Sequence, residues 1–101
     1  MKELMGYQKK YLRGLAHSMK PLVQIGQGGL TDKVIKAIDE ALNTHELVKI
    51  KLNEHKEYKK ELFAKVEQGT GCELAGIIGH TAILFRQNSD PEKQKINIPE
   101  R

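Results

Sequence analysis

The 101-residue chain has few of the residues that mark several protein classes. Its single cysteine, Cys72, excludes an internal disulfide framework and suits a reducing compartment such as the cytoplasm. It has no Trp, and aromatic residues make up only 5%, so the core must be mostly aliphatic. No apolar run approaches the roughly 20 residues of a spanning helix. No apolar run follows the first lysine either, so we expect neither a membrane partner nor a secretory signal.

Constellations for catalysis and metal binding are also lacking. The four histidines have no short metal-ligand spacing, no serine lies in a nucleophile elbow, and no acid–base pair is brought together by its spacing. Cys72, next to a predicted strand, is interpreted as a small buried hydrophobe. We therefore expect no cofactor, no metal site and no enzymatic activity. The histidines are His17, His45, His55 and His80.

The positive charge is concentrated near one end of the sequence. The net charge is +4, and the predicted pI is near 9.2. Residues 1–36 carry seven basic and two acidic residues, a net +5, whereas the other 65 residues carry ten and eleven, a net −1. Such a local excess favours a polyanionic partner, although a basic pI also serves solubility. The length predicts one domain, residues 1–87, followed by an extended tail, residues 88–101, whose Ile96 and Ile98 could dock on the domain.

Periodicity predicts an α/β fold in the order α-β-α-β-α-β-β. We expect a small four-stranded mixed sheet packed by three helices as a two-layer-type sandwich. Strands separated by helices should be parallel neighbours or near neighbours, and a final hairpin should add an antiparallel pair. The predicted helices are 3–19, 31–43 and 55–69, and the predicted strands are 22–25, 46–52, 73–78 and 81–86.

The apolar positions of these segments predict the core. The first helix would bury Leu4, Tyr11, Leu12, Leu15 and Met19. The second would start at Thr31 as N-cap and bury Val34, Ile35, Ile38, Ala41 and Leu42. Strand 46–52 alternates, with Val48, Ile50 and Leu52 inward and Lys49 and Lys51 outward. The third helix would bury Tyr58, Leu62, Phe63 and Val66, and would end at Gly69 or Gly71. Phe85 completes the aromatic core.

Gly26-Gln27-Gly28-Gly29 joins a predicted strand to a predicted helix start and is the most informative segment. Glycines let the backbone approach a phosphodiester, and a helix N-terminus adds free N–H groups and roughly +0.5 charge. Thr31 stands where the dinucleotide fingerprint requires glycine, and the P-loop lysine and spacing are missing. A turn without a ligand remains the other interpretation.

Basic residues around this segment favour nucleic acid. One face of the first helix carries Lys2, Lys9, Arg13 and Lys20, while Lys33 and Lys36 follow the glycines and Lys49 and Lys51 lie on a strand. Each of them could be an ordinary solvated side chain. Because four of the five aromatic residues are assigned to the core, leaving only Tyr7, recognition of backbone and shape is favoured over base stacking.

Several motifs together resemble the CRM domain (chloroplast RNA splicing and ribosome maturation), and most closely the bacterial single-domain YhbY-type proteins. The resemblance covers about residues 7–99. The motifs are KKYLRGLAH at 9–17, KPLVQIG at 20–26, GLT at 29–31, HELVKIK at 45–51, TG at 70–71, IGH at 78–80, LFR at 84–86 and KINIP at 95–99.

This resemblance implies a fold similar to the C-terminal domain of translation initiation factor three. It also implies RNA binding through a GxxG loop and a basic surface, and association with precursors of the large ribosomal subunit. Many members carry a basic residue inside the loop, where this chain has Gln27. That departure removes one phosphate contact.

The leading hypothesis is therefore a non-enzymatic, monomeric protein that binds RNA, namely ribosomal RNA in a large-subunit precursor. The alternative is a protein-binding adaptor on an assembly particle, and a small phosphate-ligand enzyme would lack a catalytic constellation. The predicted RNA-binding residues are Gly26, Gln27, Gly28, Gly29, Lys9, Arg13, Lys20, Lys33, Lys49 and Lys51.

Overall fold

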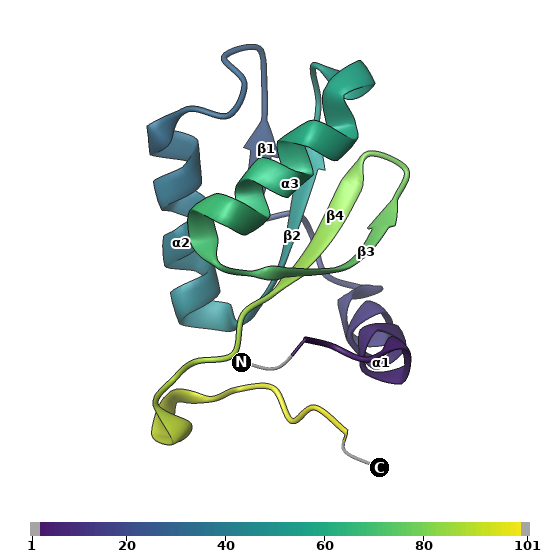
Figure 1. Ribbon diagram of the computed structural model, residues 1–101, viewed down its shortest axis with the longest axis vertical. Coiled ribbons are helices and arrows are strands. Elements are labelled where there is room, and N and C mark those ends of the chain that lie inside the picture. The colour runs from purple at the N-terminus through teal and green to yellow at the C-terminus, as the bar shows by residue number, and fades with distance from the viewer. Residues whose placement is uncertain (1–2, 100–101) are drawn as a thin grey trace.

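The structure, a computed structural model, describes residues 3–99, so Lys2 and the last two residues of the predicted tail lie outside its described part. The elements follow the predicted order, with two short 3-10 turns added (Figure 1). The helices are α1 (Gly6–Ala16), α2 (Asp32–His45) and α3 (Lys59–Thr70). The strands are β1 (Val23–Ile25), β2 (Leu47–Leu52), β3 (Glu73–Ile78) and β4 (Thr81–Phe85). The 3-10 turns are η1 (Lys56–Tyr58) and η2 (Pro91–Lys93).

The four strands form one mixed sheet in the order β1-β2-β4-β3. β1 and β2 are parallel, with Val23 opposite Ile50 and Ile25 opposite Leu52. β4 is antiparallel to both of its neighbours. The predicted hairpin joins β3 to β4, and its Gly79 has a φ of +60°, which glycine adopts without steric cost. The predicted α/β fold, with its parallel pair and antiparallel hairpin, is confirmed.

Apolar side chains lie on both faces of this sheet. α2 and α3 cover one face, where Val48, Ile50 and Leu52 are fully buried as their alternation predicts. α1 covers part of the other face, which includes Leu47 and Phe85. The buried stripe predicted for α2 also lies in the first of these clusters. Alternation along β2 therefore divides its side chains between two separate cores.

α1 is shorter than the predicted helix 3–19, and its buried stripe is narrower. The Met5 amide donates to the side-chain oxygen of Gln8 (2.9 Å), a capping contact that starts the helix at Gly6. Tyr11 and Leu15, predicted to be buried, are 41% and 40% exposed. A single short helix covers only part of a sheet face. The side chains of α1 on either side of its buried stripe, Tyr11 and Leu15 among them, therefore stay in solvent.

The predicted third helix is divided into η1 and α3. Phe63 and Val66 are buried as predicted, but Tyr58 is 51% exposed. A 3-10 turn has three residues per turn instead of 3.6, so Tyr58 does not continue the buried stripe of α3. The helix ends at Gly71, not Gly69, because Gly71 has the left-handed φ of +70° typical of a helix C-cap.

The tail after β4 is extended apart from η2, and it packs against the α1 side of the sheet. Ile96 and Ile98 contact the apolar cluster there, as predicted. The carboxylate of Glu46, which is only 1% exposed, accepts hydrogen bonds from the backbone amides of Asn88, Lys95 (2.6 Å) and Ile96 (2.8 Å). Glu46 has a φ of +62°, which costs a non-glycine residue about 1–2 kcal/mol. The tail is thus held by a buried carboxylate together with the apolar contacts of Ile96 and Ile98.

Replacing Glu46 should release this tail. Three hydrogen bonds to an ionised acceptor are lost in Glu46→Ala, so we expect the free energy of unfolding to fall by about 3 kcal/mol. Urea denaturation measures this change, and amide hydrogen exchange at Lys95 and Ile96 should become much faster. Glu40→Ala removes an exposed carboxylate from α2 and is the control. Equal effects of the two substitutions would contradict the assigned role of Glu46.

Candidate nucleic-acid interface

Residues 26–29 form a tight turn between β1 and α2, at the top of Figure 1. The amide of Gly29 donates to the carbonyl of Gly26 (3.0 Å), and Gly29 has a φ of +72°. The amides of Gln27 and Gly28 have no hydrogen-bond partner among residues 3–99. Apart from its chain neighbours, nothing lies within 4 Å of the place where a Gly28 side chain would begin. The turn therefore presents two open backbone donors at the surface.

The turn leads directly into the N-terminus of α2. Thr31 Oγ1 accepts from the amide of Val34 (3.2 Å), so the predicted N-cap is confirmed. Asp32 lies in the first helical turn and favours the positive end of the helix dipole. Lys33, in the same turn, is exposed. Backbone donors, the helix dipole and a lysine thus occur within eight residues of chain, with one carboxylate opposing them.

A histidine from the next strand connection supports the turn. His55 Nε2 lies 2.8 Å from the carbonyl oxygen of Gln27 and donates to it when that nitrogen carries the proton. The His55 ring is also 3.9 Å from the position of a Gly29 Cβ. Because β1 and β2 are parallel, with Ile25 opposite Leu52, both strands end at the same edge of the sheet. The loop after β2 therefore packs against the glycine turn.

The segment after β2, residues 53–59, adds two lysines that were absent from the predicted site, Lys56 and Lys59, together with Glu54 and Glu57. Lys59 Nζ donates to the carbonyl of Gly79 (2.8 Å), which ties the start of α3 to the hairpin. Partial desolvation, followed by the charges of Lys56 and Lys59, lowers the pKa of His80 from its ordinary value. Lys56 and Lys59 directly follow a strand predicted to neighbour the glycine-bearing one. Segments that follow two neighbouring parallel strands leave the sheet at the same edge. That rule could have identified Lys56 and Lys59 as neighbours of the glycine turn from the sequence.

The structure divides the ten predicted binding residues into two groups. One group lies where β1 and β2 end, around the glycine turn. The other group lies on α1, which is at the lower right of Figure 1, on the segment after it, or where that segment meets the sheet. The first group is Gly26, Gln27, Gly28, Gly29, Lys33 and Lys51. The second group is Lys9, Arg13, Lys20 and Lys49.

Two cations of the second group have partners within the protein. Lys49 Nζ donates to the carbonyl oxygens of His17 (3.4 Å) and Met19 (3.0 Å), just beyond the end of α1. Arg13 Nη1 donates to the carbonyl of Ala75 (3.0 Å). The Arg13 side chain also lies so close to Gly76 that a Cβ there would stand 2.5 Å from Arg13 Cδ. Both side chains hold α1 on the sheet, while Lys9 and Lys20 have no such partner among the described residues.

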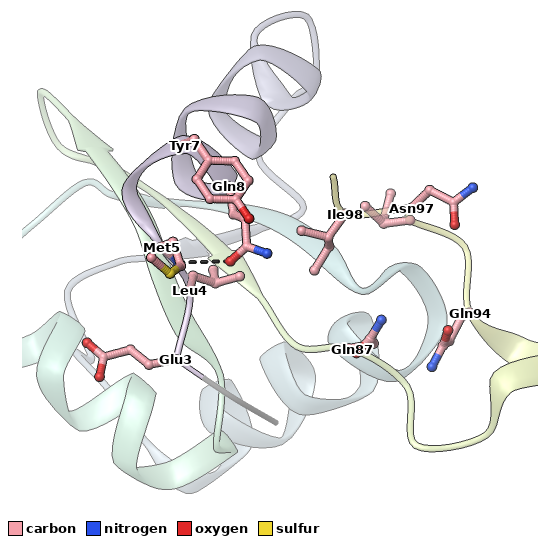
Figure 2. A pocket seen from close by; sticks show the side chains of 10 residues that line it. Glu3, Leu4, Met5, Tyr7, Gln8, Gln87, Gln94, Asn97 and Ile98 are labelled. Atoms are coloured by element: carbon pink, nitrogen blue, oxygen red, sulfur yellow. Dashed lines mark hydrogen bonds between the residues drawn. The ribbon is translucent and has the colours of Figure 1, made fainter. Parts of the chain in front are cut away.

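Two cavities differ in their suitability for a polyanion. The larger, about 570 Å³, lies between the segment before α1 and the docked tail, where Figure 2 shows Gln8, Gln87 and Gln94 around it. Its only charged lining residue is Glu3. The smaller, about 340 Å³, opens between the glycine turn and α3, and its lining includes both Glu61 and Lys65. The candidate interface at the glycine turn therefore rests on the open backbone donors of the turn, not on cavity size or on the charge of the cavity lining.

Other chemistry has little support in the described part of the chain. No group of three His, Cys, Asp or Glu side chains among residues 3–99 could hold a metal ion. Cys72 is buried as predicted, and burial raises the pKa of its thiol, which keeps it in the weakly nucleophilic protonated form. None of the described helices is long and apolar enough to cross a bilayer.

The two glycines at the end of the turn should respond differently to alanine. Gly29→Ala places a Cβ on left-handed backbone and should lower the free energy of unfolding by about 1–2 kcal/mol. Gly28→Ala, at ordinary φ and in open space, should change it by less than about 0.5 kcal/mol. Thermal and urea denaturation of the pair measure the difference. Equal losses of unfolding free energy in the two variants would contradict the left-handed φ of Gly29.

Comparison with known proteins agrees with this architecture. Residues 4–86 match the model of the CRS1 / YhbY (CRM) domain. The probable RNA-binding protein YqeI of Bacillus subtilis is 35% identical over 97 residues, covering 95% of this chain and 99% of YqeI. A Haemophilus influenzae protein named RNA-binding protein is 37% identical over 95 residues, 93% of each chain.

A solved structure shows the same fold. The solution structure of the hypothetical protein SAV1595 from Staphylococcus aureus matches with a TM-score of 0.78 and 36% identity, over 96% of this chain and 100% of that one. The resemblance seen in the sequence motifs is thus confirmed over nearly the whole chain. By its sequence and its fold, the chain belongs to the CRS1 / YhbY (CRM) domain family.

Proposed function

We propose that this protein binds RNA without catalysing a reaction, and that its target is ribosomal RNA in a precursor of the large ribosomal subunit. In this proposal it acts as a monomer in the cytoplasm. The names of the relatives from Bacillus subtilis and Haemophilus influenzae support RNA as the partner. The ribosomal target is what the family resemblance implies, and it goes beyond the names of these relatives.

The observation that carries the proposal is the open glycine turn, which presents two free backbone donors beside the connection that follows β2. The free amides of Gln27 and Gly28 can donate to phosphate oxygens, and no Gly28 side chain prevents a close approach. His55 fixes the carbonyl of Gln27, so the turn is organised before RNA arrives. Preorganised backbone donors of this kind bind phosphate without a large ordering cost.

The surrounding cations would act in two ways. Lys33 and Lys51, exposed at the same end of the sheet, would neutralise phosphates directly, and the Gln27 side chain would donate to phosphate or sugar. Lys9 and Lys20 would extend the path of the RNA along α1. Arg13 and Lys49 already donate to carbonyl groups, so they would contribute mainly through their long-range field.

Binding should be strongly salt-dependent and should depend on the glycine turn. With roughly four to six phosphate contacts, log K should fall with log[salt] at a slope of about −3 to −5. Gly28→Asp adds bulk and negative charge between the free amides, so affinity for ribosomal RNA fragments should fall at least about tenfold. Fluorescence anisotropy at several salt concentrations measures both quantities.

Ser89→Asp is the matched control for this substitution. It adds the same charge at an exposed position near η2, far below the glycine turn in Figure 1. Its effect on affinity should stay within about twofold because solvent and salt screen distant charges. Circular dichroism and melting should be unchanged in both variants. A slope near zero, or equal losses in the two variants, would contradict binding through the turn.

Crosslinking in cells, followed by sequencing of the attached RNA, tests the target. We expect reads concentrated in one region of large-subunit ribosomal RNA, with protein crosslinks at residues 26–29. Reads that follow RNA abundance would overturn the ribosomal target and leave a general RNA-binding protein. Absence of RNA crosslinks, with copurifying assembly proteins that survive RNase treatment, would instead indicate a protein-binding adaptor.

A further inference from the structure

The cavity beside the glycine turn has a composition that phosphate binding alone does not explain. Its volume is about 340 Å³, near the lower end of the range for small-ligand sites. One wall is the turn itself, and the opposite wall comes from η1 and α3. The lining on that side is Tyr58, Glu61, Leu62 and Lys65, which recur at helical spacing.

The aromatic ring of Tyr58 is available on this wall. It is 51% exposed, although the sequence pattern assigned it to the core. Leu62, one helical turn further on, is half-buried and packs against the core under α3, so it supplies a fixed apolar surface next to the ring. A planar, apolar ligand would cover both side chains. An unpaired nucleobase is such a ligand, and bases commonly stack on exposed tyrosines.

Glu61 is the unusual member of this wall. Its exposed carboxylate forms no hydrogen bond or ion pair with another group among residues 3–99. Glu61 lies in the first turn of α3, where a carboxylate favours the positive end of the helix dipole. Beside a turn that binds phosphate, however, it repels the RNA backbone, and from bound RNA it can gain only through hydrogen-bond donors. The donors on RNA bases are mainly exocyclic amino groups and ring N–H groups. Lys65, one turn away in α3, can meet a phosphate on the other side of the same nucleotide.

We propose that this cavity binds one unpaired base with an exocyclic amino group, while the adjoining phosphate lies on the glycine turn. The base stacks on Tyr58 and donates its amino group to Glu61. Uracil is disfavoured, because it has a carbonyl oxygen, O4, where cytosine has its amino group, and its one ring donor, N3–H, lies between two carbonyl oxygens that repel a carboxylate. This inference rests on the proposed RNA binding and adds to it a preference among bases.

Cytidine against uridine is the sharpest comparison, because the two bases differ in the group that meets Glu61. The probes are single-stranded RNAs of about nine nucleotides, one all uridine and one with a single central cytidine. We expect the wild-type protein to bind the cytidine probe at least fivefold more tightly at fixed salt. In Glu61→Gln the ratio should fall to about one, because an amide both donates and accepts.

Tyr58 variants test the stacking. Tyr58→Leu should weaken binding of both probes about tenfold, whereas Tyr58→Phe, which keeps the ring, should bind like wild type. Glu40→Gln makes the same chemical change on exposed α2, outside the cavity, and should leave the cytidine-to-uridine ratio unchanged. Circular dichroism and melting verify that each variant is folded.

The outcomes separate this inference from the proposed function. Salt-dependent binding of both probes with a ratio near one in wild type would overturn the base site and leave RNA binding intact. A ratio that survives Glu61→Gln, or equal binding by Tyr58→Leu and wild type, would also overturn it. Failure of both probes and of ribosomal RNA fragments to bind would overturn the proposed function and the base site with it.

Discussion

The parallel pairing of β1 and β2 is the constraint on which the candidate site depends. Because Ile25 and Leu52 lie opposite one another, the chain leaves both strands at one edge of the sheet. The glycine turn follows one strand and His55 follows the other, so their hydrogen bond is a direct consequence of that register. A shift of one residue would reverse the faces of β2 and bury Lys49 and Lys51 in place of Ile50. The core and the site therefore require the same alignment.

The same pairing also determines how charge is distributed. The basic excess of residues 1–36 favours a polyanionic partner, but these residues do not gather at one place, because α1 lies away from the glycine turn. Lys56, Lys59 and Lys65 come from the part of the chain with a slightly negative net charge, yet they lie close to the turn or its neighbouring hairpin. Net charge along the sequence therefore agrees with the RNA partner that the names of the relatives support, but it does not locate the lysines near the glycine turn.

Local signals predicted most of the fold and half of the candidate site. Thr31 as a cap and the alternation of Val48, Ile50 and Leu52 depend on near neighbours in the chain, and both were read correctly. Tyr58 was misassigned because a 3-10 turn changes the direction of a side chain without changing its spacing in the sequence. Glu46 could not be recognised, since its partners lie 42 to 50 positions later and an isolated glutamate before a strand suggests solvent exposure.

The buried carboxylate of Glu46 also makes one of the two cores depend on the last part of the chain. Its three partner amides are made long after β2, and Ile96 and Ile98, which cover the cluster under α1, arrive with them. Until then, Glu46 must remain hydrated and that face of the sheet must remain partly uncovered. The face under α2 and α3, which carries no such dependence, can close as soon as β4 has paired. The two cores of this small domain therefore differ in what they require, because only the second is incomplete without the tail.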